Sequence, residues 1–535
     1  MKTNISQLKP DSLINGILLS GIVLCALLLR LIGLTKFDFW FDEISCLSKV
    51  TFDQLTRESL KSYCFQPLYS LFLYYWRNLG SSEFLLRLPS VIAGVVSVFM
   101  MYKLVRKLFD SKTGLIGALL LGISPFAVYF SQELLPLSWV ILFSLASTYF
   151  YVKAITESSS RNWFGNITCN IINVYLRYSS IIVIFSQCLF FILYRRRFKN
   201  SKHKFFLAQL IQAILLLPWL YIVGTQLSQI FSYTQGTGQM MSFIGRVSIL
   251  NLFYTFKNFS AGYFASDIVR TISFVLMTVL FVKGAVILFS SQREKIMLIF
   301  LLYFIPIFSL LIYSQFVSFY SEKYFVYAVA FFYIPIAVYL KRLSLKPRVA
   351  IIVVISILSL ISLDDYYANR ICSNYLERQG IHPHKEYRKV AQYLKVNYIE
   401  GDLLIHVSEN SALPVEYYLN PGAKKYFIDG GVKNTFEFMR QCGIAQKCGF
   451  QHLVIHDVAA HRFYLYKDIY RAFLPQDDDL LFKKYKRIWF ISSCFESNCP
   501  EGRLVGVWLA KNFRLGERIS FNDIELLLFQ NYTLR

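Results

Sequence analysis

Two adjacent carboxylates, Asp42 and Glu43, stand in the stretch FDFWFDEIS, residues 37–45, directly after an apolar run. A carboxylate can take a proton from a hydroxyl group or hold a cation. Beside a bilayer, an ionised carboxylate is unfavourable unless it is solvated, paired or bound to a cation. Neighbouring side chains on a helical turn point in different directions, so we expect the two carboxylates to have separate roles. The stretch is therefore either an amphipathic interface segment or a reaction site at the membrane surface.

Two further groups of polar residues follow or begin apolar runs. The first group is Ser131, Gln132 and Glu133, and the second is Glu322 and Lys323. Three polar groups at one membrane level, on helices that pack side by side, could meet in a single cavity. A lone acidic residue at a helix end is equally well explained as an interfacial anchor, and this alternative stays open for Glu133.

The elements that must position these residues are membrane-spanning helices. The chain has 535 residues, of which 55% are hydrophobic and 17% are charged, a composition typical of a polytopic membrane protein. A span needs roughly 20 apolar residues, and we predict about eleven spans. They lie near residues 14–34, 84–104, 114–131, 137–155, 162–176, 177–194, 205–224, 269–289, 296–314, 321–340 and 349–363, the segment at 162–176 being the weakest.

The formal net charge of +23 is distributed over short basic clusters between every second pair of spans. The clusters are RKLFDSK at 106–112, RRRFKNSKHK at 195–204, SQREK at 291–295 and KRLSLKPR at 341–348. This alternation is typical of the positive-inside rule and argues against nucleic-acid binding. It predicts a multi-pass protein of the cell membrane, with a cytoplasmic N-terminus and with FDFWFDEIS outside. Contact with anionic membrane lipids would be a secondary role. No small-residue cleavage site follows the first span, so we expect a retained helix.

The character of the sequence changes after residue 363. We predict a transmembrane domain at 1–363 and an extracytoplasmic soluble α/β domain at 364–535 that is long enough to bury its own core. The segment HKEYRKVAQYLKVNYIE has apolar residues at helical spacing. Short runs typical of strands are DLLIHVS, HLVIHDV, KRIWFISS, LVGVWLAKNF and IELLLFQNY.

Cysteines and histidines raise the question of a metal site. The close pairs are Cys442 with Cys448, Cys494 with Cys499, and Cys46 with Cys64, all in segments predicted to lie outside. Disulfides are the expected state there, and zinc is the less favoured alternative because no second ligand pair has a matching spacing. The histidines of HLVIH, with His406 and His461, are interpreted as surface or core residues rather than metal ligands.

The residues from about 20 to 155 resemble those of a known family, and the similarity returns near 320–340. FWFDEI is followed by FQPLYS, by a turn with Gly80, Glu83 and Arg87, by a span ending in basic residues, and by SPFAVYFSQE. This order is similar to that of the membrane-embedded GT-C glycosyltransferases that use lipid-linked sugars, the relatives of protein O-mannosyltransferases and aminoarabinose transferases. SEKYFVY resembles the later Arg-Tyr segment of that family, with Lys323 in place of arginine.

The resemblance implies a reaction. The donor would be a sugar on a polyprenyl phosphate and the acceptor a hydroxyl group of a protein, lipid or glycan. Asp42 would be the general base, and Glu43 would orient the acceptor or help to bind a divalent cation, Mg²⁺ or Mn²⁺. A cation is needed to hold the phosphate charge, and a single displacement would invert the anomeric carbon. The residues predicted to bind substrate are Lys323, Tyr324, Glu133, Gln132, Arg87, Arg30 and Tyr69. Lys323 is the first candidate to hold the phosphate, and Arg30 and Arg87 are weaker candidates. For both arginines, snorkelling to the lipid headgroups is the alternative.

Two departures from the family pattern keep other functions open. Phe65 stands where many relatives have histidine, and Leu134 to Leu137 replace an Ala-Arg-x-Tyr segment. A catalytically inactive assembly factor of the same fold is therefore one alternative. A transporter or lipid flippase is another, although the polar residues collect at one face and the two halves lack internal symmetry. Neither the sugar nor the acceptor is specified by any motif.

Overall fold

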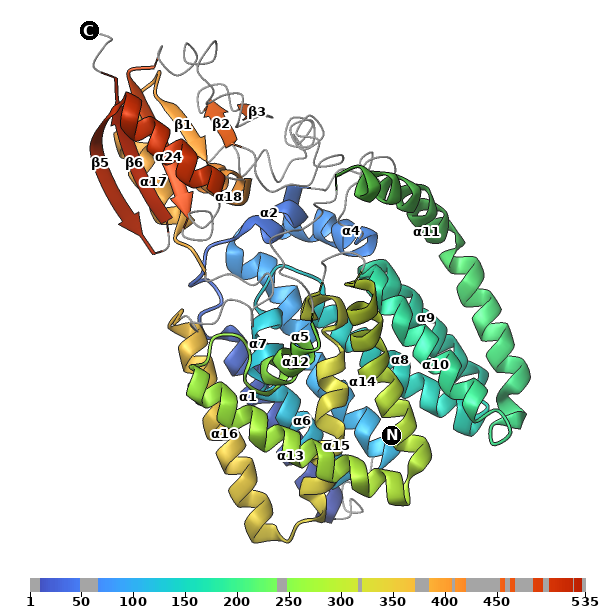
Figure 1. The fold of residues 1–535 in the computed structure, drawn as a ribbon. Helices are drawn as coiled ribbons and strands as arrows, with labels where there is room; N and C mark the ends of the chain where they lie inside the picture. The colour runs from blue at the N-terminus through green and yellow to red at the C-terminus, as the bar shows by residue number, and fades with distance from the viewer. Residues whose placement is uncertain are drawn as a thin grey trace.

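The computed structural model describes residues 10–48, 66–237, 248–315, 320–370, 384–406, 409–419, 453–457, 462–466, 485–493, 500–522 and 524–531. A bundle of helices forms one part of the molecule, and a sheet with its helices lies at one end of the bundle (Figure 1). The helices of the bundle are α1 (Pro10–Leu31), α2 (Phe41–Ser48), α4 (Pro67–Trp76), α5 (Glu83–Leu108), α6 (Ser111–Gly122), α7 (Pro125–Ser131), α8 (Leu137–Glu157), α9 (Ser160–Leu176), α10 (Ile181–Leu193), α11 (Lys202–Thr237), α12 (Leu250–Ala261), α13 (Asp267–Ser291), α14 (Arg293–Tyr313), α15 (Ala328–Arg342) and α16 (Leu345–Tyr367).

Seven of the described helices are long and apolar enough to cross a membrane, namely α1, α5, α8, α11, α13, α14 and α16. They confirm the polytopic helical fold. The predicted span at 114–131 consists of two helices, α6 and α7, which are bent by 61°, and counting them as one span gives eight. The helices α9, α10 and α15, in the three remaining predicted spans, have only 17, 13 and 15 residues. The predicted count of about eleven is therefore not confirmed.

The bend between α6 and α7 has a local cause. Ser124 caps α7, its Oγ accepting the backbone N–H of Ala127 at 3.3 Å. Pro125 follows at the first position of α7, where its missing N–H does no harm, but it cannot continue the preceding helix. The bend brings the end of α7 against α1, so that Gln132 donates to the Ile32 carbonyl at 2.7 Å.

Helices too short or too polar to span alone are held inside the bundle. Helix α15 contacts α6, α13 and α14, and almost all of its residues are buried. Helix α9 carries buried asparagines that bind its neighbours: Asn166 donates to Gln187 Oε1 at 3.1 Å and Asn170 donates to Gln212 Oε1 at 2.8 Å. Polar contacts of this kind stabilise helix packing where water is scarce.

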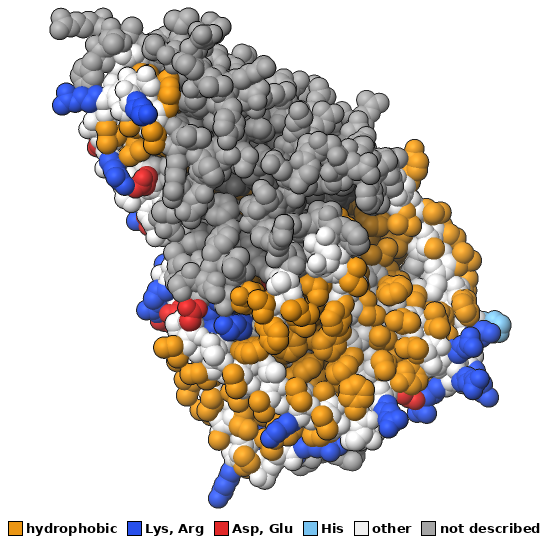
Figure 2. Space-filling model, in the orientation of Figure 1, with side chains coloured by type: hydrophobic (Ala, Val, Ile, Leu, Met, Phe, Trp, Pro, Cys, Tyr) orange, Lys and Arg blue, Asp and Glu red, His pale blue; other side chains and the backbone are white. Residues whose placement is uncertain are grey.

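The four basic clusters meet at one end of the bundle. Lys341 pairs with Asp110 at 3.4 Å, Arg197 pairs with Glu294 at 2.8 Å, and Lys295 lies 5.0 Å from the ring of Phe109. Figure 2 shows a broad hydrophobic surface over the helices, with lysine and arginine side chains gathered along its lower edge. The sheet lies at the opposite end in Figure 1.

The C-terminal segment, residues 364–535, contains a six-stranded sheet in the order β3-β2-β1-β4-β6-β5. Strand β1 pairs with β4 in parallel, and all other pairs are antiparallel. The strands are β1 (Leu403–His406), β2 (Leu453–Asp457), β3 (Arg462–Tyr466), β4 (Arg487–Ser493), β5 (Arg514–Phe521) and β6 (Ile524–Gln530), and the helices are α17 (Tyr387–Asn397), α18 (Glu409–Leu419) and α24 (Pro500–Asn512).

One predicted strand of this segment is wrong. LVGVWLAKNF forms most of helix α24, in which Leu509 is buried while Val507 is exposed, and Phe513, directly after the helix and four residues from Leu509, is also buried. A run dense in apolar residues does not by itself distinguish a strand from a helix, and here the burial follows the helical period. Among the cysteines predicted to pair, Cys46 lies in α2, and the other five lie outside the described residues, as do His452 and His461.

Candidate active site

The predicted general base, Asp42, lies in the first turn of the short helix α2, where the helix dipole favours a negative charge. Its Oδ2 is 3.2 Å from Nζ of Lys323, and the Asp42 side chain retains 41% of its exposure, whereas Lys323 retains 12%. Lys323 Nζ also lies 4.3 Å from the centre of the Trp40 ring. The structure thus brings together two predicted site residues that are 281 positions apart, and it leaves the carboxylate accessible.

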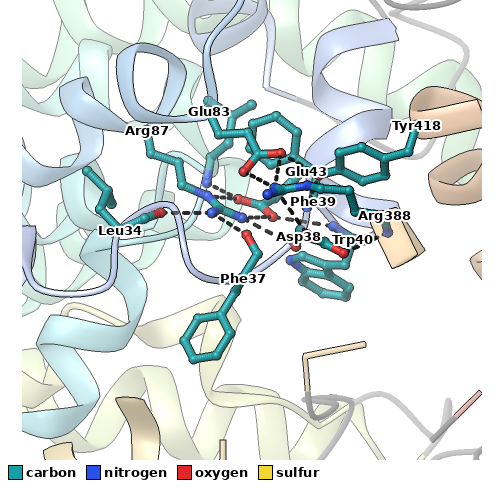
Figure 3. A network of polar contacts seen from close by, with 11 residues as sticks. Leu34, Phe37, Asp38, Phe39, Trp40, Glu43, Glu83, Arg87, Arg388 and Tyr418 are labelled. Carbon is teal, nitrogen blue, oxygen red and sulfur yellow. Dashed lines mark hydrogen bonds and ion pairs between the residues drawn. The ribbon is translucent and has the colours of Figure 1, made fainter. Parts of the chain in front are cut away.

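Glu43, the adjacent carboxylate, is completely buried. Arg87 donates to it twice, from Nε to Oε1 at 2.9 Å and from Nη2 to Oε2 at 2.7 Å (Figure 3). The backbone N–H of Leu134 donates to Oε1 at 2.7 Å, and that of Trp40 donates to Oε2 at 3.4 Å. A two-pronged arginine contact with further N–H donors is a strong arrangement for a buried carboxylate. Glu43 therefore ties α2 to α5 and to the loop after α7.

Arg87, a candidate for phosphate binding, contacts protein acceptors in the structure. Besides Glu43, its guanidinium donates from Nη1 to the carbonyls of Leu34 and Phe37 at 2.9 and 2.8 Å, and from Nη2 to that of Asp38 at 3.5 Å. A guanidinium has five N–H groups, and all five are directed at these protein acceptors. Arg87 therefore holds the loop between α1 and α2, and it offers no donor to a phosphate in this arrangement.

Arg30, at the end of α1, is also buried rather than directed at a ligand. It donates to the carbonyls of Ala26 and Gly122 at 3.0 and 2.9 Å and to the hydroxyl of Ser131 at 3.2 Å. A Cβ at Gly94 would overlap the Arg30 and Ser131 side chains, so a glycine is required at this close approach. Arg30 therefore joins α1, α6 and α7 through these contacts.

Gln132 and Glu133 lie in the loop between α7 and α8, next to Glu43 and its partners. Gln132 donates from Nε2 to the carbonyl of Arg30 at 2.9 Å as well as to that of Ile32. Glu133 is 2% exposed, and among the described residues no hydrogen bond reaches either of its carboxylate oxygens. Burial raises the pKa of Glu133 to about 8, although the nearby Lys323 charge acts in the opposite direction.

Known proteins resemble this chain in part of its sequence and in its fold. Residues 66–222 match the family model described as dolichyl-phosphate-mannose-protein mannosyltransferase. ArnT from Cupriavidus metallidurans in the apo state is similar over 95% of this chain and 97% of its own, with a TM-score of 0.56 and 10% identity. ArnT from the same organism bound to undecaprenyl phosphate has a TM-score of 0.55 over 96% of this chain and 98% of its own, also at 10% identity. An Archaeoglobus fulgidus oligosaccharyltransferase in complex with Zn and sulfate has a TM-score of 0.51 over 95% of this chain and 73% of its own, at 14% identity. No curated protein sequence matches.

The chain has the GT-C glycosyltransferase fold. Similarity at such low identity shows the fold alone, and the family match over 66–222 adds the class of enzyme. Together they confirm the resemblance drawn from the motifs and the prediction of a glycosyltransferase.

Two tyrosines complete the predicted set of residues in the candidate site. Tyr324 follows Lys323, and the guanidinium of Arg177 lies 4.6 Å from its ring centre. Tyr69 is buried on α4. The motifs did not point to Arg177, because it lies where the weak segment at 162–176 meets the predicted span at 177–194, far from any motif. Glu322 is buried and accepts hydrogen bonds from Thr255 and Asn258 at 3.1 and 3.0 Å, so it anchors the turn that carries Lys323.

The residues of this GT-C site do not fit the predicted divalent cation. Both oxygens of Glu43 are already bound by Arg87, and Asp42 faces Lys323 rather than a second carboxylate. Within the described ranges, no three His, Cys, Asp or Glu side chains are grouped as metal ligands. No role in the mechanism is therefore assigned to Mg²⁺ or Mn²⁺.

Proposed function

We propose that the chain transfers a sugar from a polyprenyl phosphate to a hydroxyl acceptor on the extracytoplasmic face of the membrane. Asp42 acts as the general base, and the anomeric carbon is inverted. The observation that carries this proposal is the accessible Asp42 carboxylate, held 3.2 Å from Lys323 at one end of the helical bundle. The ArnT structure with undecaprenyl phosphate adds support, because a protein of the same fold binds such a lipid.

The pairing of Asp42 with Lys323 suggests how the site responds to the donor. A phosphate that contacts Lys323 competes with Asp42 for the ammonium charge, which leaves the carboxylate free to accept a proton. The acceptor oxygen then attacks the anomeric carbon, its proton passes to Asp42, and the bond from that carbon to the phosphate oxygen breaks. The leaving polyprenyl phosphate takes the electron pair and is stabilised by Lys323.

The other predicted residues have different roles in this proposal. Tyr324 and Tyr69 border the donor site, and Glu133 is a buried carboxyl group near Lys323. Glu43 and Gln132 position the loops on either side of Asp42 through the contacts described above.

The proposal also includes the orientation in the membrane. The basic clusters meet at the end of the bundle away from the sheet, which by the positive-inside rule is the cytoplasmic end. Asp42 and residues 364–535 then lie outside, and the N-terminus lies inside. Val396 of α17 is highly exposed, so a Val396→Cys variant should become labelled by a membrane-impermeant thiol reagent on intact cells, above the parent chain. Protection of that cysteine until the cells are lysed would reverse the orientation.

The reaction is tested with the purified full-length protein and a radiolabelled sugar on polyprenyl phosphate. Loss of a general base typically costs a factor of about 10²–10⁴, so Asp42→Asn should reduce the rate of transfer by that amount. Asp364→Asn is the matched control, because the Asp364 side chain is 73% exposed at the end of α16. An unchanged rate in Asp42→Asn would refute the role of Asp42. No transfer by the wild-type chain from any donor of this class would favour the inactive assembly factor.

A further inference from the structure

The loop between α1 and α2 contacts the C-terminal segment as well as the membrane helices. The backbone N–H of Arg388, in the first turn of α17, donates to Oδ2 of Asp38 at 2.8 Å. The guanidinium of Arg388 lies 3.1 Å from Oδ1 of the same carboxylate. Asp38 stands four residues before Asp42, so α17 holds the chain just before it enters the helix of the proposed base.

The same arginine reaches the start of α5. Nη2 of Arg388 is 2.7 Å from each oxygen of Glu83, and the hydroxyl of Tyr418 in α18 donates to Oε1 of Glu83 at 2.6 Å. That hydroxyl in turn accepts the backbone N–H of Phe39 at 2.8 Å. A closed set of hydrogen bonds therefore joins the loop, α5, α17 and α18 (Figure 3).

Packing continues this contact up to the helix that bears Asp42. Helix α18 packs against α2. The ring of Phe39 is completely buried, with Arg87 at 4.7 Å from its centre and the Tyr417 ring at 5.7 Å. The loop is thus held by Arg87 from the membrane helices and by Arg388 with Tyr418 from the C-terminal segment.

The contact depends on the charge of Arg388. The side chains of Asp38 and Glu83 are 10% and 13% exposed, and both carboxylates share this one guanidinium. Burial raises the pKa of Asp38 to about 6, and the contacts with Arg388 oppose that rise. Removal of Arg388 would leave two mostly buried carboxylates side by side, and they would separate or take up water.

We propose that Arg388 is a positioning residue, through which the C-terminal segment sets the placement of Asp42 against the donor. The inference rests on the proposed function of Asp42. Displacement of a reacting group by about 1 Å can cost a factor of about 10², so a loosened loop is expected to slow the chemical step. Donor binding should change less than turnover, because the turn that carries Lys323 is anchored through Glu322 to Thr255 and Asn258 rather than to the loop.

Steady-state kinetics of the full-length protein test this role. Arg388→Ala should lower kcat by about 10-fold to 100-fold, while KM for the polyprenyl-phosphate donor stays within about twofold. Arg388→Lys keeps the positive charge but not the planar guanidinium that contacts both carboxylates, so it should recover part of kcat. Lys389→Ala is the matched control, since Lys389 is the next residue of α17, is 61% exposed and pairs only with Glu386 among the described residues.

Hydrogen–deuterium exchange gives a second measurement that does not require activity. Peptides covering residues 37–48 should exchange faster in Arg388→Ala than in the wild type, while peptides of α13 should be unchanged. Wild-type kcat in Arg388→Ala, or slower turnover with unchanged exchange at 37–48, would overturn the proposal. If the wild-type protein transfers no sugar, the proposed function fails. Hydrogen–deuterium exchange then still tests whether Arg388 holds the loop. Unchanged exchange at 37–48 in Arg388→Ala would show that it does not, whether or not the protein transfers sugar.

Discussion

Asp42 and Glu43 are neighbours in the sequence but occupy opposite environments. Asp42 keeps 41% of its side-chain exposure and meets a lysine at 3.2 Å, whereas Glu43 has none and is bound by an arginine at two positions. In the partly exposed pair, the accessible Asp42 can exchange Lys323 for a substrate group. The buried pair cannot, because separation would leave a desolvated charge.

This difference supports the proposed role of Asp42 in the chemistry and an architectural role for Glu43. Exposed ion pairs contribute little to stability, typically about 0–1 kcal/mol, whereas breaking a buried pair costs several times more. Variants at the two positions should therefore affect different measurements, and four expected outcomes are given below in order of decreasing effect.

The largest effect is expected from Glu43→Gln. It leaves the Arg87 guanidinium buried beside a neutral amide, and the loss of one partner of a buried pair costs about 3–5 kcal/mol. The protein in detergent should unfold at a clearly lower temperature than the wild type in a fluorescence-detected thermal scan. Glu157→Gln is a suitable control, since that side chain is 40% exposed in its pair with Lys107. Equal unfolding temperatures for Glu43→Gln and the wild type would contradict an architectural role.

The next effect concerns the partner of Asp42. Hydrogen bonds to charged groups contribute about 1.5–3 kcal/mol, so Lys323→Ala should raise KM for the polyprenyl-phosphate donor by about tenfold or more. Lys323→Arg should restore part of the affinity. The exposed Lys346→Ala serves as the control for a general change in surface charge. If KM for the donor is unchanged in Lys323→Ala, the lysine does not hold the phosphate.

A smaller effect is expected in the pH dependence of stability at Glu133, the third carboxylate of the site. Its pKa is raised from 4.5 to about 8 by burial, so the native protein keeps a proton there that the unfolded chain has released above about pH 4.5. Stability should therefore fall as the pH rises from about 5 to 8 and level off above that. Glu133→Gln removes this titration, and its unfolding temperature should decline less over the same interval. Parallel pH profiles for the two proteins would show that Glu133 is not protonated in the fold.

The smallest effect is expected in the stability of Asp42→Asn. Asp42 is only partly buried, and asparagine keeps an oxygen that can accept a hydrogen bond from Lys323, so the free energy of unfolding should change by no more than about 1–2 kcal/mol. The unfolding temperature should stay close to that of the wild type even though transfer is lost. A large fall in the unfolding temperature would remove the contrast between the two carboxylates.

Hydropathy and residue spacing were sufficient to predict most of the long helices, but not the bend between α6 and α7 or the identity of α24. The seven long apolar runs, and the helical spacing at 387–397, were sufficient to predict α1, α5, α8, α11, α13, α14, α16 and α17. The bend at Ser124 and Pro125 divided one predicted span, although the capping serine and the proline are visible in the sequence. The strand predicted at 504–513 became α24, because an apolar run fits either element until its neighbours decide which side chains are buried.

The sequence by itself determined the membrane class, the position of the basic clusters and the motif that contains Asp42, since hydropathy and residue order are local properties. Only the tertiary structure decided what each charged group faces. Arg87 lies 44 positions from Glu43, Lys323 lies 281 positions from Asp42, and Arg388 lies 350 positions from Asp38. Partners at such separations are chosen by helix packing and by the burial that makes an unpaired charge costly. The same acidic motif therefore contains one accessible carboxylate and one that holds the fold together.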